Sequence, residues 1–191
     1  MIPIPDVHGQ TSLTGKPRDR DGKADSKSFL VKAPLTTDIW EQHLKGEKII
    51  GCTPLINEDR VHWGVLDVDV YQESNTIEDI LTSVKEHNLP FVVCRSKSGG
   101  AHVYLFFSEE VSAANVIDKL KSFSAFFGQG ACEIYPKQPK IGNRKDDSKY
   151  GNWINMPYSG NPTLQYAFDA DGNALNPQEF LEYVQTKTLS I

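Results

Sequence analysis

The stretch VHWGVLDVDV (residues 61–70) decides both the fold and the first candidate site. Its β-branched and aromatic residues are typical of a strand in a buried sheet. Asp67 and Asp69 are separated by one residue, so on a strand both carboxylates leave the same face. Two like charges on an apolar strand are costly unless a cation or a network of donors compensates them. A divalent metal is the simplest compensation, and a solvated edge or turn is the alternative for a lone pair of this kind.

The segments that follow this strand predict a ferredoxin-like palm. Apolar residues recur at helical spacing in two of them, and the other three have strand composition. In order, the expected elements are a strand at 61–70, a helix at 76–88, strands at 90–96 and 101–107, a helix at 112–127 and a strand at 131–136. The order is therefore βαββαβ, which predicts an α/β (α+β) fold with an RRM-like sheet.

Flanking segments complete the predicted organisation. Residues 1–28 are rich in Gly, Pro, Ser, Asp and Lys without an apolar period, which predicts a flexible N-terminal arm. Residues 29–191 are expected to form a single catalytic core, with the palm motifs at 61–157 and additional N-terminal α/β elements. Further expected elements are a helix near 36–46, a strand at 152–156, a hairpin at 165–175 and a terminal helix that Asn176 caps.

Several polar residues converge in this fold. In a βαββαβ sheet of order 4-1-3-2 the first strand lies between the third and fourth strands and runs antiparallel to both. The end of the first strand, with Asp67 and Asp69, is then adjacent to His102 at the start of the third strand and Glu133 at the start of the fourth. Three carboxylates suit Mg²⁺ or Mn²⁺, and two such ions are a recurring solution for nucleotidyl transfer. The sequence therefore predicts Asp67, Asp69 and Glu133 as metal ligands.

A glycine turn beside these acids predicts a phosphate site. The stretch RSKSGGAH (residues 95–102) supplies cations, hydroxyl groups and glycines whose backbone N–H groups can approach an oxyanion. Its candidate nucleotide-binding residues are Arg95, Ser96, Lys97, Ser98 and His102. A plain hairpin turn is the alternative for SKSGG. The segment PKQPKIGNRK (residues 136–145) adds Lys137 and further basic residues that either hold phosphates or form a solvated loop.

Composition narrows the function classes. The chain has 191 residues and a formal net charge of −5, which excludes a polybasic nucleic-acid binder. Three cysteines without a CxxC pair fit reduced thiols and argue against a disulfide framework or a zinc knuckle. No apolar run approaches the ~20 residues of a membrane span, and no export signal is visible. We therefore expect a cytoplasmic protein with no membrane partner.

Four motifs in order resemble one enzyme family. The series GVLDVDV, SKSGGAHVYLFF, CEIYPKQ and GNWINMPY (from residues 64, 96, 132 and 151) is similar to the motifs of the archaeo-eukaryotic primase superfamily. The resemblance is to the branch that includes the primase of TOTE conflict systems and phage- or CRISPR-associated primase-polymerases. WEQHLKG (residues 40–46) also resembles that branch, so the likeness extends over about residues 30–160.

The resemblance implies a role for each matching position. It implies that Asp67, Asp69 and Glu133 bind two divalent metals, Mg²⁺ or Mn²⁺, and are catalytic together with His102. It places the phosphates of an incoming NTP or dNTP on His102 and Ser98, with Lys137 and Asn152 nearby. The implied activity is that of a DNA primase-polymerase on a single-stranded or primed DNA template. A separate helicase or replication partner and a phage- or plasmid-encoded origin in a prokaryotic cell are further expectations.

Two other function classes remain open at this point. A template-independent nucleotidyltransferase or nucleotide cyclase would use the same metal ligands without a basic groove. A non-catalytic RRM-like nucleic-acid-binding module would instead present aromatic residues on its central strands, and Tyr104 and Phe106 share one face of the third strand. Such a module has no use for Asp67 and Asp69 beside those rings.

Overall fold

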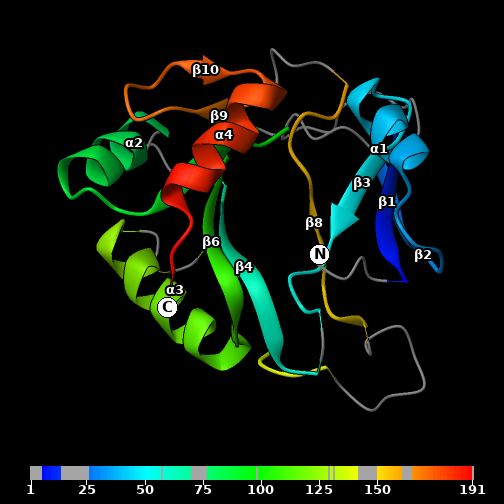
Figure 1. The fold of residues 1–191 in the computed structure, drawn as a ribbon, viewed down its shortest axis with the longest axis horizontal. Coiled ribbons are helices and arrows are strands. Elements are labelled where there is room, and N and C mark those ends of the chain that lie inside the picture. Colours follow the sequence, from blue (N-terminus) through cyan, green and yellow to red (C-terminus); the bar gives the residue numbers. More distant parts are fainter. Residues whose placement is uncertain are drawn as a thin grey trace.

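Two antiparallel β-sheets organise the described part of the chain (Figure 1). The computed structural model describes residues 6–13, 26–56, 58–69, 77–97, 99–128, 130, 132–141, 150–160 and 165–190. The larger sheet has the strand order β10-β9-β5-β6-β4-β7, and the smaller sheet has the order β2-β1-β3-β8. The larger sheet consists of β4 (Arg60–Val68), β5 (Phe91–Arg95), β6 (Ala101–Ser112), β7 (Glu133–Tyr135), β9 (Ala167–Phe168) and β10 (Ala174–Leu175).

The remaining elements are the strands of the smaller sheet and the helices. The smaller sheet consists of β1 (His8–Leu13), β2 (Ser26–Val31), β3 (Ile49–Cys52) and β8 (Ile154–Asn155). The helices are α1 (Thr37–Leu44), α2 (Ile77–Glu86), α3 (Ala113–Phe126) and α4 (Pro177–Lys187). Among the described residues, no helix is both long enough and apolar enough to cross a membrane.

The predicted palm is confirmed in its element order and its strand order. β4 lies between β6 and β7 and is antiparallel to both, while β5 pairs with the other edge of β6. This is the order 4-1-3-2 of a βαββαβ unit. β6 continues to Ser112, beyond the expected end at residue 107. The predicted C-terminal hairpin also forms, and its strand β9 pairs with β5, so it enlarges the palm sheet.

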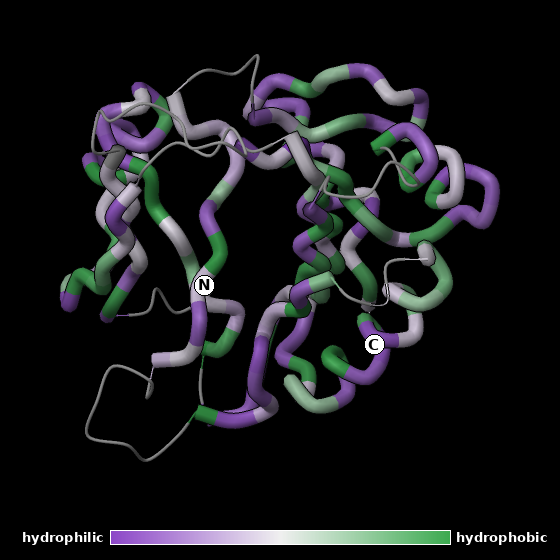
Figure 2. Tube along the Cα trace, turned by 180° about the vertical axis from the view of Figure 1, so that it is seen from behind, coloured by the Kyte–Doolittle hydropathy of each residue, from purple (hydrophilic) through white to green (hydrophobic). Residues whose placement is uncertain are grey.

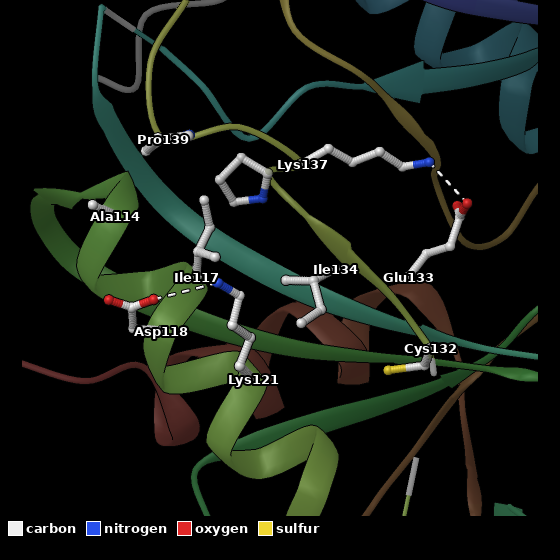
Figure 3. A pocket seen from close by; sticks show the side chains of 10 residues that line it. Ala114, Ile117, Asp118, Lys121, Cys132, Glu133, Ile134, Lys137 and Pro139 are labelled. Carbon is white, nitrogen blue, oxygen red and sulfur yellow. Dashed lines mark ion pairs between the residues drawn. The ribbon is translucent and has the colours of Figure 1, made fainter. Parts of the chain in front are cut away.

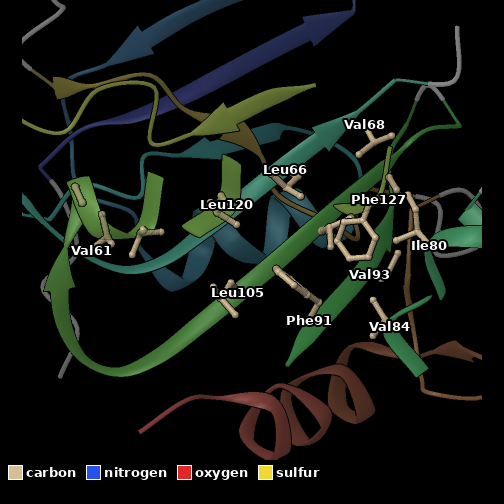
Figure 4. Close-up of a cluster of buried hydrophobic side chains, with 14 of the residues drawn as sticks. Val61, Leu66, Val68, Ile80, Val84, Phe91, Val93, Leu105, Leu120 and Phe127 are labelled. Atoms are coloured by element: carbon tan, nitrogen blue, oxygen red, sulfur yellow. The ribbon is translucent and has the colours of Figure 1, made fainter. Parts of the chain in front are cut away.

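One face of the palm sheet packs against α2 and α3. Alternate strand residues meet apolar helix residues there in one buried cluster (Figure 4), which includes Leu66, Ile80, Val93, Leu105 and Leu120. Full burial of such a side chain contributes about 1.5–3 kcal/mol. Gly64 lets α3 approach β4 directly, because a Cβ at this position would lie 2.6 Å from Cγ1 of Val116. Figure 2 shows hydrophilic residues interspersed with hydrophobic ones along these helices, as expected when a helix buries one face.

The opposite face carries a second buried cluster. Tyr104 of β6, Tyr135 of β7 and Tyr158 are among its buried members. Ile154 of β8 also belongs to it, which joins the smaller sheet to this face of the palm. The helix α4 adds Phe180, whose ring centroid lies 5.4 Å from that of Tyr158. The start of α4 has the predicted capping box, in which Asn176 and Glu179 satisfy each other's backbone N–H groups.

The N-terminal region differs from the predicted arm over residues 1–28. His8–Leu13 and Ser26–Val31 form the paired strands β1 and β2, and β1 also pairs with β3. Residues 1–5 and 14–25 lie outside the described residues. The apolar pattern could not indicate these strands because polar groups join them: the Thr11 hydroxyl lies 3.0 Å from the Ser28 hydroxyl and 3.2 Å from the Asn155 side chain. Backbone pairing needs no hydrophobic alternation.

A buried histidine joins α1 to the smaller sheet. The His43 ring has no solvent exposure. Its Nδ1 accepts the backbone N–H of Ile50 at 3.2 Å, and its Nε2 donates to the carbonyl of Pro157 at 2.8 Å. Acceptance at Nδ1 requires the neutral ring, and burial lowers the pKa of His43 below its ordinary value. The sequence indicates only an isolated histidine, for which a position at the surface or at the edge of the core is the ordinary expectation, whereas His43 is fully buried.

We expect the fold to lose stability when the medium becomes acidic. The unfolded chain protonates His43 near the ordinary pKa of 6.5, whereas the folded chain resists protonation. Stability from the neutral ring is therefore complete above pH 6.5 and is lost as the pH falls below it, by up to about 1.4 kcal/mol per pH unit. Urea unfolding at pH 7.5 and 5.5 measures this slope. A His43→Gln variant should have a flatter slope, and a slope equal to that of the unmodified chain would contradict the assignment.

Candidate active site

Asp67 lies in one row of the palm sheet with His102 and Glu133. In the register of the sheet, Asp67 of β4 is paired with His102 of β6 on one side and with Glu133 of β7 on the other. Residues directly opposite on antiparallel strands leave the same face, with Cβ atoms about 4.5–5.5 Å apart. The register therefore brings these three predicted residues together, and we call them the Asp67 row.

His102 contacts Asp67 within this row. Its Nε2 lies 3.4 Å from Oδ1 of Asp67, whose side chain is 25% exposed. Its Nδ1 lies 3.5 Å from the hydroxyl oxygen of Tyr104. Burial raises the pKa of Tyr104 well above its ordinary value, so the phenol keeps its proton and donates to Nδ1. This favours the tautomer in which Nε2 carries the hydrogen that faces Asp67.

Glu133 has two partners from its own segment. Oε1 lies 2.9 Å from Nζ of Lys137, and Oε2 accepts the hydroxyl proton of Tyr135 at 3.0 Å. The Lys137 nitrogen also lies 5.0 Å from the centroid of the Tyr135 ring. Burial, together with the neighbouring Glu133 carboxylate, raises the pKa of Tyr135, so its hydroxyl remains a donor. The third carboxylate of the predicted set is thus held by a cation and by a neutral donor.

The glycine turn lies directly against the end of β4. A Cβ at Gly100 would lie 2.2 Å from the carbonyl oxygen of Val68, so only glycine fits this approach. Gly99 has a φ of +93°, and its N–H donates to the carbonyl of Ser96 at 3.1 Å. Asp69 follows β4 immediately and is exposed. The turn that was predicted to cradle phosphates therefore lies beside the predicted metal ligands.

Arg95, Ser96, Lys97 and Ser98 belong to the segment of this turn, whereas the predicted Asn152 lies on another segment. Arg95 ends β5, Ser96 is buried and Lys97 is exposed. Ser98 lies outside the described residues. Asn152 is exposed on the segment that leads into β8, and its neighbour Gly151 lies against Thr53.

A cavity borders the Asp67 row along β7. It has a volume of about 530 Å³ and lies between α3 and the segment that includes β7 (Figure 3). Ile117, Ile134 and Pro136 are among its apolar lining residues. Figure 3 shows the Lys137–Glu133 pair on one side of this lining and an Asp118–Lys121 ion pair, 3.6 Å long, on the other. Glu133 of the Asp67 row and its partner Lys137 both line this cavity.

The donor set fits a hard divalent cation in its chemistry. Carboxylate oxygens are the ligands that Mg²⁺ and Mn²⁺ prefer, and Asp67 and Glu133 are direct neighbours across the sheet. Within the described residues, no three His, Cys, Asp or Glu side chains are already gathered as a metal cluster. The side chain of Glu133 is 55% exposed and its Oε1 is engaged by Lys137, so a cation at this carboxylate would take the place of the ammonium group.

Sequence reasoning missed two tyrosines of this site. Tyr104 contacts His102, and Tyr135 contacts both Glu133 and Lys137. The alternation of side chains along a strand could have found both. Tyr104 follows His102 by two residues and Tyr135 follows Glu133 by two, so each pair must lie on the same face of the sheet. The sequence suggested Tyr104 only as an aromatic residue on the sheet face of an RRM-like module, whereas in the structure it is 3% exposed and stacked on Phe106.

A comparison with protein-family models agrees with the motif resemblance. A family model described as "TOTE conflict system, Archaeo-Eukaryotic Primase domain" matches residues 4–167. No curated protein matches the sequence. A similar solved structure is the AEP domain of the primase-polymerase of cyanophage S-2L, with 13% identity, a TM-score of 0.44, and coverage of 95% of this chain and 90% of that chain. The family match spans most of this chain, which therefore belongs to the archaeo-eukaryotic primase domain family of TOTE conflict systems.

Proposed function

We propose that this chain catalyses template-directed nucleotidyl transfer from an NTP or dNTP to a 3′-hydroxyl group of DNA. The observation that supports the proposal most strongly is the Asp67 row, in which the sheet register aligns two carboxylates and an imidazole. Membership of an archaeo-eukaryotic primase family makes a primase- or polymerase-type domain the expected setting for such a row. No side chain of the row needs to act as a covalent nucleophile.

The carboxylates are proposed as the metal site. Asp67 and Glu133 would hold divalent cations from adjacent strands, and Asp69 would join them from the end of β4. Bound Mg²⁺ or Mn²⁺ would supply activation of the attacking hydroxyl and neutralisation of the leaving pyrophosphate. Oδ1 of Asp67 also lies 3.4 Å from Nε2 of His102.

The glycine turn and β6 are proposed as the triphosphate site. Gly99 and Gly100 have no Cβ, so phosphate oxygens could approach the backbone of this turn closely, and the Arg95 guanidinium lies 3.8 Å from where a Cβ of Gly99 would stand. His102 would add its Nε2–H from the row itself once a bound cation engages the carboxylate of Asp67. The proposed phosphate-binding residues are Arg95, Ser96, Lys97, Ser98 and His102, with Lys137 and Asn152 as further candidates near the nucleotide.

Charge distribution supports a weak and local contact with the template. The whole chain has a net charge of −5, but residues 95–150 contain nine Lys or Arg and six Asp or Glu residues. Template affinity should therefore decrease with salt and increase with divalent cations. A separate helicase or replication protein would strengthen template binding in the cell, and a cytoplasmic, phage- or plasmid-encoded context suits such a partner.

A nucleotide-incorporation assay tests the proposal against its rivals. The purified chain is incubated with labelled NTPs or dNTPs and Mn²⁺ or Mg²⁺, with single-stranded template, with primed template, and without template. Extension of the primer only when template is present supports the proposal. Product made without template would favour a template-independent nucleotidyltransferase or a cyclase. Template binding without any product would favour a non-catalytic module.

A further inference from the structure

The two oxygens of Glu133 have partners of different kinds. Oε1 faces the ammonium group of Lys137 at 2.9 Å, whereas Oε2 accepts the neutral hydroxyl of Tyr135 at 3.0 Å. A divalent cation can replace the ammonium group at Oε1, because both are positive charges that need the same lone pairs. The hydroxyl at Oε2 can stay in place during such an exchange.

Tyr135 is held more firmly than either of its charged partners. Its residue is 7% exposed and packs in the second buried cluster with Val65 and Tyr104. The side chains of Glu133 and Lys137 are 55% and 35% exposed, so they have more room to change rotamer than the buried ring of Tyr135. Lys137 also lies over the face of this ring, which gives the ammonium group a second attractive contact.

We propose that Tyr135 is a positioning residue that keeps Glu133 oriented while Oε1 passes from Lys137 to a divalent cation. The proposal rests on the metal site proposed above. Lys137 is the counter-ion of Glu133 in the metal-free protein, and its release by the metal makes its ammonium group available to a nucleotide phosphate. Metal binding and nucleotide binding are thereby coupled through one lysine.

Direct binding of Mn²⁺ to the protein without nucleotide tests the role of Tyr135. Tyr135→Phe keeps the packed ring and removes only the hydroxyl, so we expect the Mn²⁺ dissociation constant to rise about tenfold, as for other residues that orient metal ligands. Tyr183→Phe is the matched control, because Tyr183 has the same kind of lysine contact, with Nζ of Lys187 5.6 Å from its ring on α4, and is not a partner of Glu133, whose oxygens face Lys137 and Tyr135. This control should bind Mn²⁺ as the unmodified chain does. Thermal unfolding of both variants verifies that the fold is intact.

Substitution of Lys137 is expected to change the Mn²⁺ affinity in the opposite direction to Tyr135→Phe. Lys137→Met removes the competitor for Oε1, so we expect Mn²⁺ to bind more tightly, while the apparent nucleotide affinity decreases. Unchanged Mn²⁺ affinity in Tyr135→Phe, with a clear loss in Glu133→Gln, would overturn the role of Tyr135 and leave the metal site standing. Unchanged Mn²⁺ affinity in Glu133→Gln would overturn both the metal site and this inference.

Discussion

Asp67→Asn is expected to reduce nucleotide incorporation by at least about 10³-fold, since metal-held charge stabilisation contributes several kcal/mol to such a transition state. The substitution keeps the size of the side chain and removes its charge. Asp67 is the member of the Asp67 row with neighbours on both sides, so its carboxylate is the most central of the proposed ligands. Single-turnover primer extension with saturating Mn²⁺ measures the loss.

Asp59→Asn is the matched control for this variant. Asp59 directly precedes β4, and its exposed carboxylate lies 3.8 Å from Nε of Arg60. Asp59→Asn makes the same chemical change as Asp67→Asn but at the opposite end of β4. Incorporation should remain within about twofold of that of the unmodified chain, because an exposed ion pair contributes little to stability. Full activity in Asp67→Asn would refute the metal assignment, and an equal loss in Asp59→Asn would indicate general damage to β4.

His102→Ala is expected to raise the apparent KM for the nucleotide by about 10–100-fold, because a hydrogen bond to a charged phosphate contributes about 1.5–3 kcal/mol. The rate at saturating nucleotide should change less. Steady-state primer extension over a nucleotide concentration series separates the two quantities. His87→Ala provides the comparison, since His87 lies on the segment after α2 and bonds to the carbonyl of Ser83. An unchanged KM in His102→Ala would contradict the phosphate role.

The palm could be predicted from the sequence because its helices and strands have distinct apolar periods. Ile80 and Val84 on α2, and Val116 and Leu120 on α3, repeat at helical spacing and are buried as expected. Once the βαββαβ order was known, the strand order placed Asp67 between His102 and Glu133. No side-chain detail was needed for that step.

The smaller sheet could not be predicted in the same way. β1 and β2 have polar residues and a glycine where an alternation of apolar and polar residues would have indicated a strand. The sheet also needs β3 and β8, which come from distant parts of the chain. Gly9 and Gly51 leave room for the ring of Trp153, whose atoms lie within 2.3 Å of where a Cβ would stand. This long-range contact has no local sequence signal, and it shows that Trp153 is a packing residue.

The surroundings of the candidate site were predicted only in part. The positions of the carboxylates follow from register, but the partners of Glu133 depend on side-chain rotamers and on the path of residues 136–137. Lys137 was expected to be near the nucleotide, and in the structure it is paired with the third carboxylate. Ser98 and the basic residues Arg144 and Lys145 lie outside the described residues, so their expected roles stay predictions.

A template-exchange experiment tests the central claim most directly. Primed DNA templates that differ only in the first unpaired base are each offered the four dNTPs singly, with Mn²⁺, and the extended primer is resolved on a gel. We predict that the added base follows the template base for the unmodified chain and that all extension is lost in Asp67→Asn. Addition of the same base whatever the template, or extension by Asp67→Asn at the unmodified rate, would contradict template-directed transfer at the Asp67 row.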